Sequence, residues 1–382
     1  MPRTPLFIIL LTVFVDLIGF GIIIPLLPVY ASRYGANAMV IGIFMMTFSL
    51  MQFVLAPAVG KLSDRIGRRP VIIISMFITA SSYILFGFAG NLSVLFISRI
   101  FSGIGSSSFS VAQAYIADVT TPENRAKGMG MFGAAFSVGF VLGPLICGVL
   151  SPFGHGVPAF AAAGFSGITA ITALFLLPEP ERRKTKPGKA KGLFKSINKG
   201  LKIIVLLNFI VIFIQSQLQS MIVLFNVDHF NWTEKENGYF LGVIGLVAAV
   251  IQGGLIGILT KRFGQYKLIS FGILLIGAGM FIISRVGSAQ LLYSGGMINA
   301  LGFACALPSL ASLASLYSPE HLQGQTMGLY QSMGSLGRIL APVAGGILFD
   351  RISPSAPFFT GAVLAVIIVI VSFPFLAKLE KD

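Results

Sequence analysis

The sequence is poor in charged residues and in residues that bind metals. Only 10% of its 382 residues are charged, and it contains two cysteines and three histidines. A soluble globular protein usually has about 25% charged residues. Both cysteines, Cys147 and Cys305, lie inside apolar runs, so we expect neither a structural disulfide nor a metal site. These shortages argue against a soluble protein and against metal chemistry.

Catalytic and nucleotide-binding signatures are also missing. The sequence has no HExxH, no GxSxG and no GxxxxGK[ST] phosphate-binding loop. We therefore expect that the protein is not an enzyme and uses no cofactor. A non-transporting membrane sensor, whose long linker binds a partner, is an alternative from a different class.

Long apolar runs dominate what is present. Hydrophobic residues make up 55% of the chain, and the mean hydropathy is +0.89. A helix that spans a membrane needs about 20 predominantly apolar residues. The sequence therefore predicts an all-α integral membrane protein with twelve transmembrane helices, at residues 6–30, 39–59, 70–89, 92–117, 128–150, 157–177, 203–227, 237–259, 267–285, 289–316, 325–349 and 356–377.

The basic residues lie mainly in alternate connectors between these spans. With the N-terminus in the cytoplasm, 21 Lys and Arg residues fall on the cytoplasmic side, nine of them in 178–202, and four on the opposite side, namely Arg33, Lys235, Arg285 and Arg351. Such a bias is the positive-inside signal. It predicts a multi-pass membrane protein with both termini cytoplasmic. The net charge of +14 then reflects topology, and we expect no nucleic-acid partner.

The second half of the chain repeats the first at an offset of 197–198 residues. Gly67 corresponds to Gly264, Pro122–Glu123 to Pro319–Glu320, and Pro144 to Pro342. The repeat predicts an N-terminal six-helix bundle (1–177), a basic cytoplasmic linker (178–202) and a C-terminal six-helix bundle (203–382). Parallel repeats of this kind are typical of transporters whose site lies between the halves, near the middle of the membrane.

Four motifs give the sequence a resemblance to a known family. They are GKLSDRIGRR (60–69), DLIGFGIIIPLLP (16–28), RIFSGIG (99–105) and GFVLGPLICG (139–148). At these positions of a twelve-span repeat, they resemble the major facilitator superfamily, and within it the twelve-span drug/proton antiporters that include the tetracycline exporters. The resemblance covers essentially the whole chain. It implies the major facilitator fold and a secondary transporter that exports small amphiphilic compounds, in exchange for protons, by alternating access.

The resemblance also assigns a role to the basic connector after the second span. It implies that Arg68 pairs with Asp118 and that Asp64 lies against the N-terminus of span eleven, where the positive end of a helix favours a carboxylate. A simpler alternative is that the connector only anchors positive charge in the cytoplasm. The residues of this conformational latch are Gly60, Asp64, Arg65, Gly67, Arg68, Arg69 and Asp118.

Three charged residues, Asp16, Arg99 and Arg338, fall inside predicted spans. A charge at the centre of a span costs about 2.5–3.5 kcal/mol, so such residues usually serve a function. A carboxyl group held between desolvation and a nearby cation can bind and release a proton, and we assign proton coupling to Asp16. The resemblance gives Arg99 an influence on proton transfer. Structural hydrogen bonding of Asp16, tethering by Arg99 and a structural partner role for Arg338 are the alternatives.

Polar residues in the spans are candidates for lining a substrate cavity. In span seven, Asn208, Gln215, Gln219 and Asn226 fall on one helical face, and in lipid such a face must look inward. Gln331 and Arg338 share a face of span eleven. Isolated amides equally often join helices. The full candidate set is Asp16, Gln52, Gln113, Asn208, Gln215, Gln219, Gln252, Asn299, Gln331 and Arg338.

Span five carries the pattern that resembles the antiporter motif, Gly139, Gly143, Pro144 and Gly148. The spacing of Gly139 and Gly143 allows another helix to approach closely, and Pro144 should bend the span. A role for this pattern in antiport rests on the resemblance alone.

The sequence departs from the tetracycline exporters in its second half, where those proteins carry additional acids within the membrane. Here Asp228, Glu234, Glu236, Glu320 and Asp350 all fall in connectors or at span ends. One acid against two arginines within the spans favours a neutral, zwitterionic or anionic amphiphile as substrate. Transport of a metabolite such as a sugar, an amino acid or a lipid is the nearest alternative. The expected partners are this small molecule, protons and the lipid bilayer, and we expect a monomer.

Overall fold

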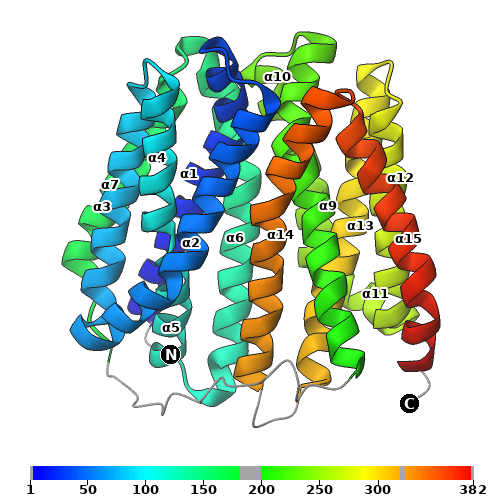
Figure 1. Ribbon diagram of the computed structural model, residues 1–382. Coiled ribbons are helices and arrows are strands. Elements are labelled where there is room, and N and C mark those ends of the chain that lie inside the picture. Colours follow the sequence, from blue (N-terminus) through cyan, green and yellow to red (C-terminus); the bar gives the residue numbers. More distant parts are fainter. Residues whose placement is uncertain (1–2, 181–198, 319–322, 380–382) are drawn as a thin grey trace. The chain divides into compact units, whose positions relative to one another are not determined.

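The computed structural model describes residues 3–180, 199–318 and 323–379, and these residues form helices without any strand (Figure 1). Most of the predicted linker, and the Pro319–Glu320 match of the repeat, lie outside the described residues. The helices are α1 (Arg3–Arg33), α2 (Ala38–Ile66), α3 (Arg68–Gly87), α4 (Leu92–Ser106), α5 (Phe109–Val119), α6 (Pro122–Leu150), α7 (Val157–Leu176), α9 (Lys199–Phe230), α10 (Glu234–Val250), α11 (Ile256–Phe263), α12 (Gln265–Ser284), α13 (Ala289–Leu316), α14 (Gln323–Arg351) and α15 (Ala356–Leu379), with short helices η1 (Ser151–Phe153) and η2 (Ile251–Leu255).

Twelve helical segments of the described chain are long and apolar enough to cross a membrane, which confirms the predicted number. Two predicted spans are not single regular helices. Span four is divided into α4 and α5, where the Ser107 and Ser108 hydroxyl groups donate to the carbonyls of Ile104 and Gly105. Such serine bonds compete with the helical ladder and promote bending. Span eight contains the π-helical turn η2, which includes Gly253 and Gly254.

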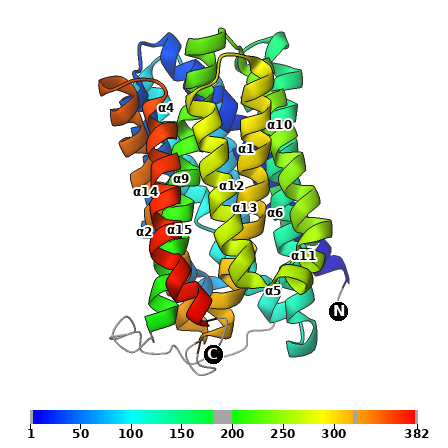
Figure 2. The same cartoon turned by 90° about the vertical axis from the view of Figure 1, so that its right-hand side faces the viewer.

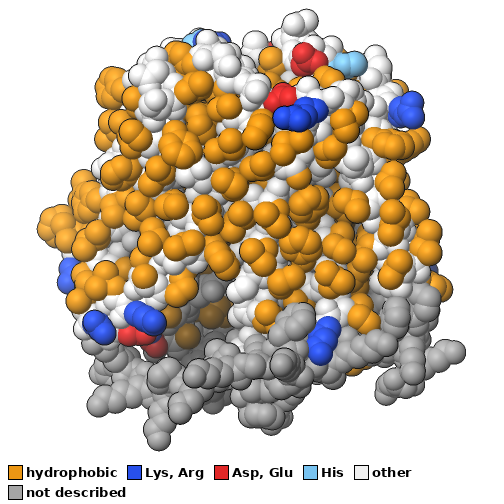
Figure 3. All heavy atoms as spheres, viewed as in Figure 1, with side chains coloured by type: hydrophobic (Ala, Val, Ile, Leu, Met, Phe, Trp, Pro, Cys, Tyr) orange, Lys and Arg blue, Asp and Glu red, His pale blue; other side chains and the backbone are white. Residues whose placement is uncertain are grey.

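Apolar side chains cover the outer faces of these helices. Phe175 is 76% exposed, Ile370 67% and Ile168 65%, although all three lie within spans. In Figure 3 hydrophobic side chains spread along the sides of the helices, and the charged ones lie near helix ends. So much exposed apolar surface is stable only where lipid is the solvent. The protein is therefore a multi-pass membrane protein.

The chain forms two compact units. Unit 1 contains Met1–Asn37, Ile43–Thr185 and Asn226–Gly242, and unit 2 contains Ala38–Gly42, Lys186–Phe225 and Val243–Asp382. In unit 1, α1 packs against α6 and α7, and α3 packs between α4 and α7 (Figure 1). In unit 2, α12 packs against both α13 and α15 (Figure 2).

These units differ from the predicted bundles by two short segments. Ala38–Gly42, from the first half of the sequence, belongs to unit 2, and Asn226–Gly242, from the second half, belongs to unit 1. We call them the exchanged segments. Apart from them, the units divide the chain near the predicted linker.

The two glycines that the repeat matches, Gly67 and Gly264, have similar backbone conformations. Gly67 separates α2 from α3 with φ 115° and ψ 155°, and Gly264 separates α11 from α12 with φ 78° and ψ 158°. Residues with a side chain rarely adopt positive φ, so both turns favour glycine. The same glycine turn at corresponding places in both halves supports the internal repeat.

Candidate functional site

Asp16 lies in the middle of α1, and only 9% of the residue is exposed. Its atom Oδ1 is buried and has no hydrogen-bond partner among the described residues. One turn further on, the ring of Tyr83 lies on Gly19, so closely that a Cβ atom at Gly19 would be 2.6 Å from Tyr83 Cε2. The carboxyl group is thus enclosed by protein and does not face lipid.

Arg99 is the second buried charge of unit 1. It lies on α4, is 2% exposed, and places its guanidinium carbon 5.4 Å from the centre of the Phe86 ring on α3. An aromatic face attracts a cation more strongly when the pair is desolvated. The atoms Nε and Nη2 of Arg99 have no hydrogen-bond partner in the described part of the chain.

Tyr83 lies near both of these charged residues. It is 1% exposed and lies within electrostatic range of both Asp16 and Arg99. The sequence motifs did not indicate it, because a tyrosine in an apolar span resembles the many phenylalanines. Its hydroxyl group was the available signal, since the chain has nine tyrosines and 34 phenylalanines. Unit 1 therefore encloses an acid, an arginine and a phenol hydroxyl.

Several of the predicted cavity residues already hold another part of the protein. Gln52 donates to the Ser106 carbonyl at 3.2 Å, where the α4–α5 break removes a helical partner. Asn208 donates to the Tyr330 carbonyl at 2.8 Å. Arg338 donates to Ser335 Oγ at 3.1 Å, one turn away on α14. At Gln52 and Asn208 these bonds fit the alternative that isolated amides join helices, whereas the bond of Arg338 stays within α14.

Other predicted cavity residues keep unpartnered polar atoms. Asn299 is fully buried, and neither of its side-chain polar atoms has a hydrogen-bond partner among the described residues. The same holds for Oε1 of Gln215, which is 7% exposed. Gln113, Gln219 and Gln252 are half-buried, and Gln331 is exposed. Asn226, on the same predicted face of span seven, donates to Asn237 Oδ1 at 2.9 Å and thus joins α9 to α10.

The glycines of α6 make close contacts with α1. A Cβ atom at Gly143 would lie 2.6 Å from both Gly21 Cα and the Ile18 carbonyl oxygen, and one at Gly139 would lie 2.7 Å from the Phe14 carbonyl oxygen. The predicted close helix approach is therefore present. Because α1 carries Asp16, these contacts fix the backbone that positions the buried acid.

The basic connector forms a network around Arg68. Its Nε donates to Asp118 at 3.2 Å, which is the pairing that the resemblance implies, and its Nη1 lies 2.6 Å from Asp64 Oδ1. The motifs did not point to Glu179. Its carboxylate accepts hydrogen bonds from the backbone N–H groups of Arg68 (2.7 Å) and Arg69 (3.0 Å) and so caps α3. An acid at the beginning of the basic linker was the only available signal.

Contact with Glu179 is a second reason for a glycine at position 67. A Cβ atom there would lie 2.7 Å from Glu179 Oε2. Gly60, by contrast, has open space where a Cβ would stand. The first glycine of the motif is therefore not needed for packing in unit 1.

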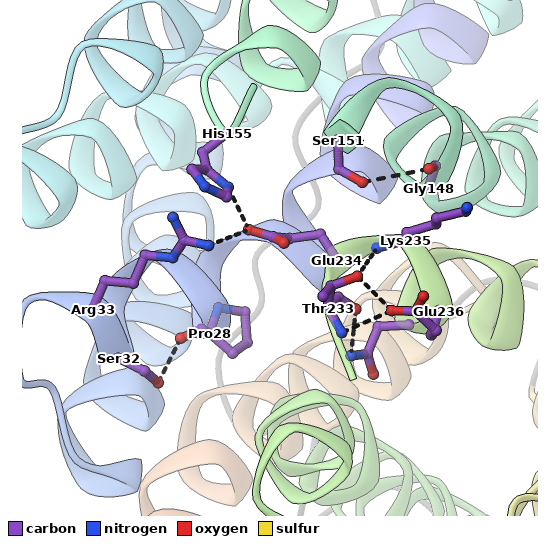
Figure 4. A network of polar contacts seen from close by, with 11 residues as sticks. Pro28, Ser32, Arg33, Gly148, Ser151, His155, Thr233, Glu234, Lys235 and Glu236 are labelled. Carbon is purple, nitrogen blue, oxygen red and sulfur yellow. Dashed lines mark hydrogen bonds and ion pairs between the residues drawn. The ribbon is translucent and has the colours of Figure 1, made fainter. Parts of the chain in front are cut away.

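One acid of the second half, Glu234, lies at a span end as predicted but is more enclosed than that position indicates. Glu234 stands at the beginning of α10, but its side chain is only 3% exposed, because His155 and Arg33 cover it (Figure 4). The sequence indicates where Glu234 lies along the span. It does not indicate that the connector with His155 folds over this residue. Asp350, at the end of α14, accepts hydrogen bonds from the backbone N–H groups of Ala38 and Met39.

Twelve spans, an internal repeat and an enclosed acid and arginine are the features of a secondary transporter. Comparison with known proteins identifies the kind. The family model described as Major Facilitator Superfamily matches residues 9–256 and 253–382. The chain belongs to the major facilitator superfamily.

Individual relatives agree with this assignment. The chain is 32% identical over 380 residues to multidrug resistance protein 2 of Bacillus subtilis (strain 168), covering 94% of this chain and 93% of the relative. It is 31% identical over 354 residues to the class E tetracycline resistance protein of Escherichia coli, covering 89% and 87%. The crystal structure of the human organic anion transporter MFSD10 (TETRAN) has the same fold, with a TM-score of 0.72, 23% identity, and coverage of 97% of this chain and 99% of that one.

Proposed function

We propose that the protein is a proton-coupled antiporter that exports small amphiphilic compounds by alternating access. The enclosed Asp16 carries this proposal. Its Oδ1 lacks a hydrogen-bond partner among the described residues, and it shares unit 1 with Arg99 and Tyr83. A carboxyl group in such surroundings can exchange a proton with water when a cavity opens to one side.

The cycle needs no nucleotide. A proton that crosses the membrane supplies about 2.3 kcal/mol per 100 mV, and the bundles move about a central site. Asp16 binds the proton, while Arg99 and Tyr83 set the electrostatic surroundings in which it is held or released. Asn299 and Gln215 supply polar atoms for a substrate.

The names of the relatives, tetracycline and multidrug resistance proteins, favour an amphiphilic drug-like substrate. The described spans enclose Asp16, Arg99 and Arg338, and Glu234 at a span end already has cationic and imidazole partners. This balance disfavours a strictly cationic drug and favours a neutral, zwitterionic or anionic compound. A metabolite carrier of the same fold is the second candidate.

The location and assembly belong to the same proposal. The positive-inside bias supports cytoplasmic termini, and the similarity to proteins of Escherichia coli and Bacillus subtilis favours a bacterial inner membrane as the location. One chain contains both repeats, which supports a monomer as the functional unit.

The deciding experiment uses the purified protein in liposomes with an imposed pH gradient. A panel of cationic, neutral, zwitterionic and anionic amphiphiles is offered, and both substrate movement and internal pH are recorded. We expect at least one non-cationic compound to move against its gradient with simultaneous proton counterflow. Transport that is indifferent to the pH gradient would refute proton coupling, and transport of sugars or amino acids alone would favour the metabolite carrier.

Removing the charge of Asp118 or Asp64 tests the proposed cytoplasmic latch. Contacts of this kind contribute about 0.3–1 kcal/mol when exposed and about 2 kcal/mol when partly buried. We therefore expect Asp118→Asn and Asp64→Asn to increase the inward-open population, by up to about 30-fold if the full 2 kcal/mol is lost. Distances between spin labels at the cytoplasmic helix ends measure this shift.

Lys61→Gln is the matched control, because Lys61 is an exposed charge at the same end of α2. It should leave the populations unchanged. If both acid variants kept the wild-type distance distribution, the connector would be a charge anchor and not a latch.

A further inference from the structure

The carboxylate of Glu234 has no part in the proposed cycle, although it is almost fully enclosed. Its Oε1 lies 3.0 Å from His155 Nδ1 and 3.8 Å from Arg33 Nη2. Figure 4 shows both side chains directed at this one oxygen from separate elements, α1 and the connector before α7. Among the three side chains Glu234 is 3% exposed, His155 43% and Arg33 47%. The acid is thus the enclosed centre of the group, and its two partners form a water-facing cover.

The start of α10 does not explain this carboxylate, because a different acid caps that helix. Glu236 Oε2 accepts a hydrogen bond from the Thr233 backbone N–H at 2.8 Å and also contacts the Thr233 hydroxyl. This is half of a capping box, with Thr233 at the N-cap and Glu236 three residues later. Glu234 is therefore available for contacts beyond its own helix, and Arg33 and His155 make them.

The contact joins the two halves of the sequence. Arg33 ends α1 and His155 precedes α7, whereas Glu234 lies in the exchanged segment Asn226–Gly242. Two glycines hold the same segment against α6. A Cβ atom at Gly148 would lie 3.0 Å from the Lys235 carbonyl oxygen, and one at Gly238 would lie 2.7 Å from Gly148 Cα.

The other exchanged segment is held in a similar way. Asp350 Oδ1 accepts a hydrogen bond from the Ala38 N–H at 3.0 Å, and Oδ2 accepts one from the Met39 N–H at 2.9 Å. Each exchanged segment is thus fastened by one carboxylate from the second half of the sequence to the first half. Both contacts lie at span ends that the charge bias places opposite the basic connectors.

We propose that Glu234, with Arg33 and His155, is a latch that holds the exchanged segment Asn226–Gly242 in unit 1 while the transporter is closed at this end. The inference rests on the proposed alternating access, in which the two halves must part at this end once in each cycle. A buried carboxylate without its partners is strongly unfavourable. We therefore expect the contact to break only together with a movement of the segment that lets water surround the carboxylate.

The chain contains its own reporter for this movement. Cys147, on α6 beside Gly148, is completely buried and lies within electrostatic range of Glu234. With Cys305→Ser in the background, Cys147 is the single thiol, and we expect a water-soluble maleimide to reach it more often when the exchanged segment leaves α6. The measurement is the labelling rate of the full-length protein in lipid nanodiscs.

We expect Glu234→Gln to raise the labelling rate by about tenfold, which corresponds to about 1.4 kcal/mol in the opening equilibrium. Glu236→Gln, two residues further along the same helix, removes an acid that serves only the helix start, and it should leave the rate near the wild-type value. If Glu234→Gln does not yield folded protein, the double variant Arg33→Gln/His155→Gln removes the same contact from the water-facing side and should raise the rate equally.

An unchanged rate in folded Glu234→Gln or in the double variant would overturn the latch, and an equal rise in Glu236→Gln would show a general loss of helix stability instead. The result is independent of proton coupling. If the protein fails the pH-gradient assay but shows the expected labelling rates, the latch is supported and proton coupling is not. If it passes the pH-gradient assay but the labelling rates do not change, proton coupling is supported and the latch is not.

Discussion

Replacing Asp16 by asparagine is expected to abolish transport against a gradient. One proton exchanged per substrate at 100 mV supplies about 2.3 kcal/mol, enough for a gradient of about 50-fold. Asparagine has nearly the same size as aspartate but cannot carry a proton at any working pH. The variant should therefore bind substrate and let it equilibrate, with the final concentration ratio falling to about one. Counterflow in liposomes without a pH gradient measures the exchange that remains.

Asp16→Glu is the matched control for this change. It retains a protonatable group on the same turn of α1 and should preserve a gradient, at a reduced rate, because the longer side chain displaces the acid relative to Arg99 and Tyr83. If Asp16→Asn still accumulated substrate against a pH-driven gradient, the proton would have to travel by another group. Glu234 would then be the first candidate, since it is also an enclosed acid of unit 1.

The sequence predicted those features that can be recognised from the order of residues along the chain. Apolar runs of span length predicted the correct number of membrane helices, and the repeat matched Gly67 with Gly264, which form similar turns in the structure. Asp16 and Arg99 could be selected as candidates because a charge within an apolar run has few explanations other than function, and the structure buries both residues. Gly139 and Gly143 could be assigned to a helix contact because their spacing places them on one face.

What the sequence did not predict depends on contacts between distant segments. Glu234 was placed correctly at a span end, but nothing nearby in the chain indicates that Arg33 and His155 cover it. Gln52 was predicted to line the cavity, and the sequence did not indicate that its amide donates to the Ser106 carbonyl at the break between α4 and α5. In both cases the polar side chain was recognised correctly, but its partner could be identified only from the fold.

A methyl group at Gly143 is expected to have the largest effect on stability. The added Cβ of Gly143→Ala would lie 2.6 Å from Gly21 Cα and from the Ile18 carbonyl oxygen. Both are backbone atoms of α1 and cannot turn aside, so α1 and α6 must separate. Overpacking of this kind costs about 1–3 kcal/mol. At about 2.1 cal/mol/K per residue, the unfolding entropy of a 382-residue chain gives about 1.2 °C per kcal/mol, so the melting temperature of the purified protein should fall by about 1–4 °C.

Gly133→Ala provides the control on the same helix, because a Cβ atom there meets no other atom within 4 Å. This change removes only the flexibility of glycine in the unfolded chain, and it should leave the melting temperature equal or slightly higher.

The double variant Gly21→Ala/Gly143→Ala should cost less stability than the sum of its two single changes, because one displacement of α1 relieves both contacts. Strict additivity, or a fall in Gly133→Ala as large as that in Gly143→Ala, would mean that the close approach of these helices does not determine stability. If stability does fall as expected, transport should fall with it, since the displaced helix is the one that carries Asp16.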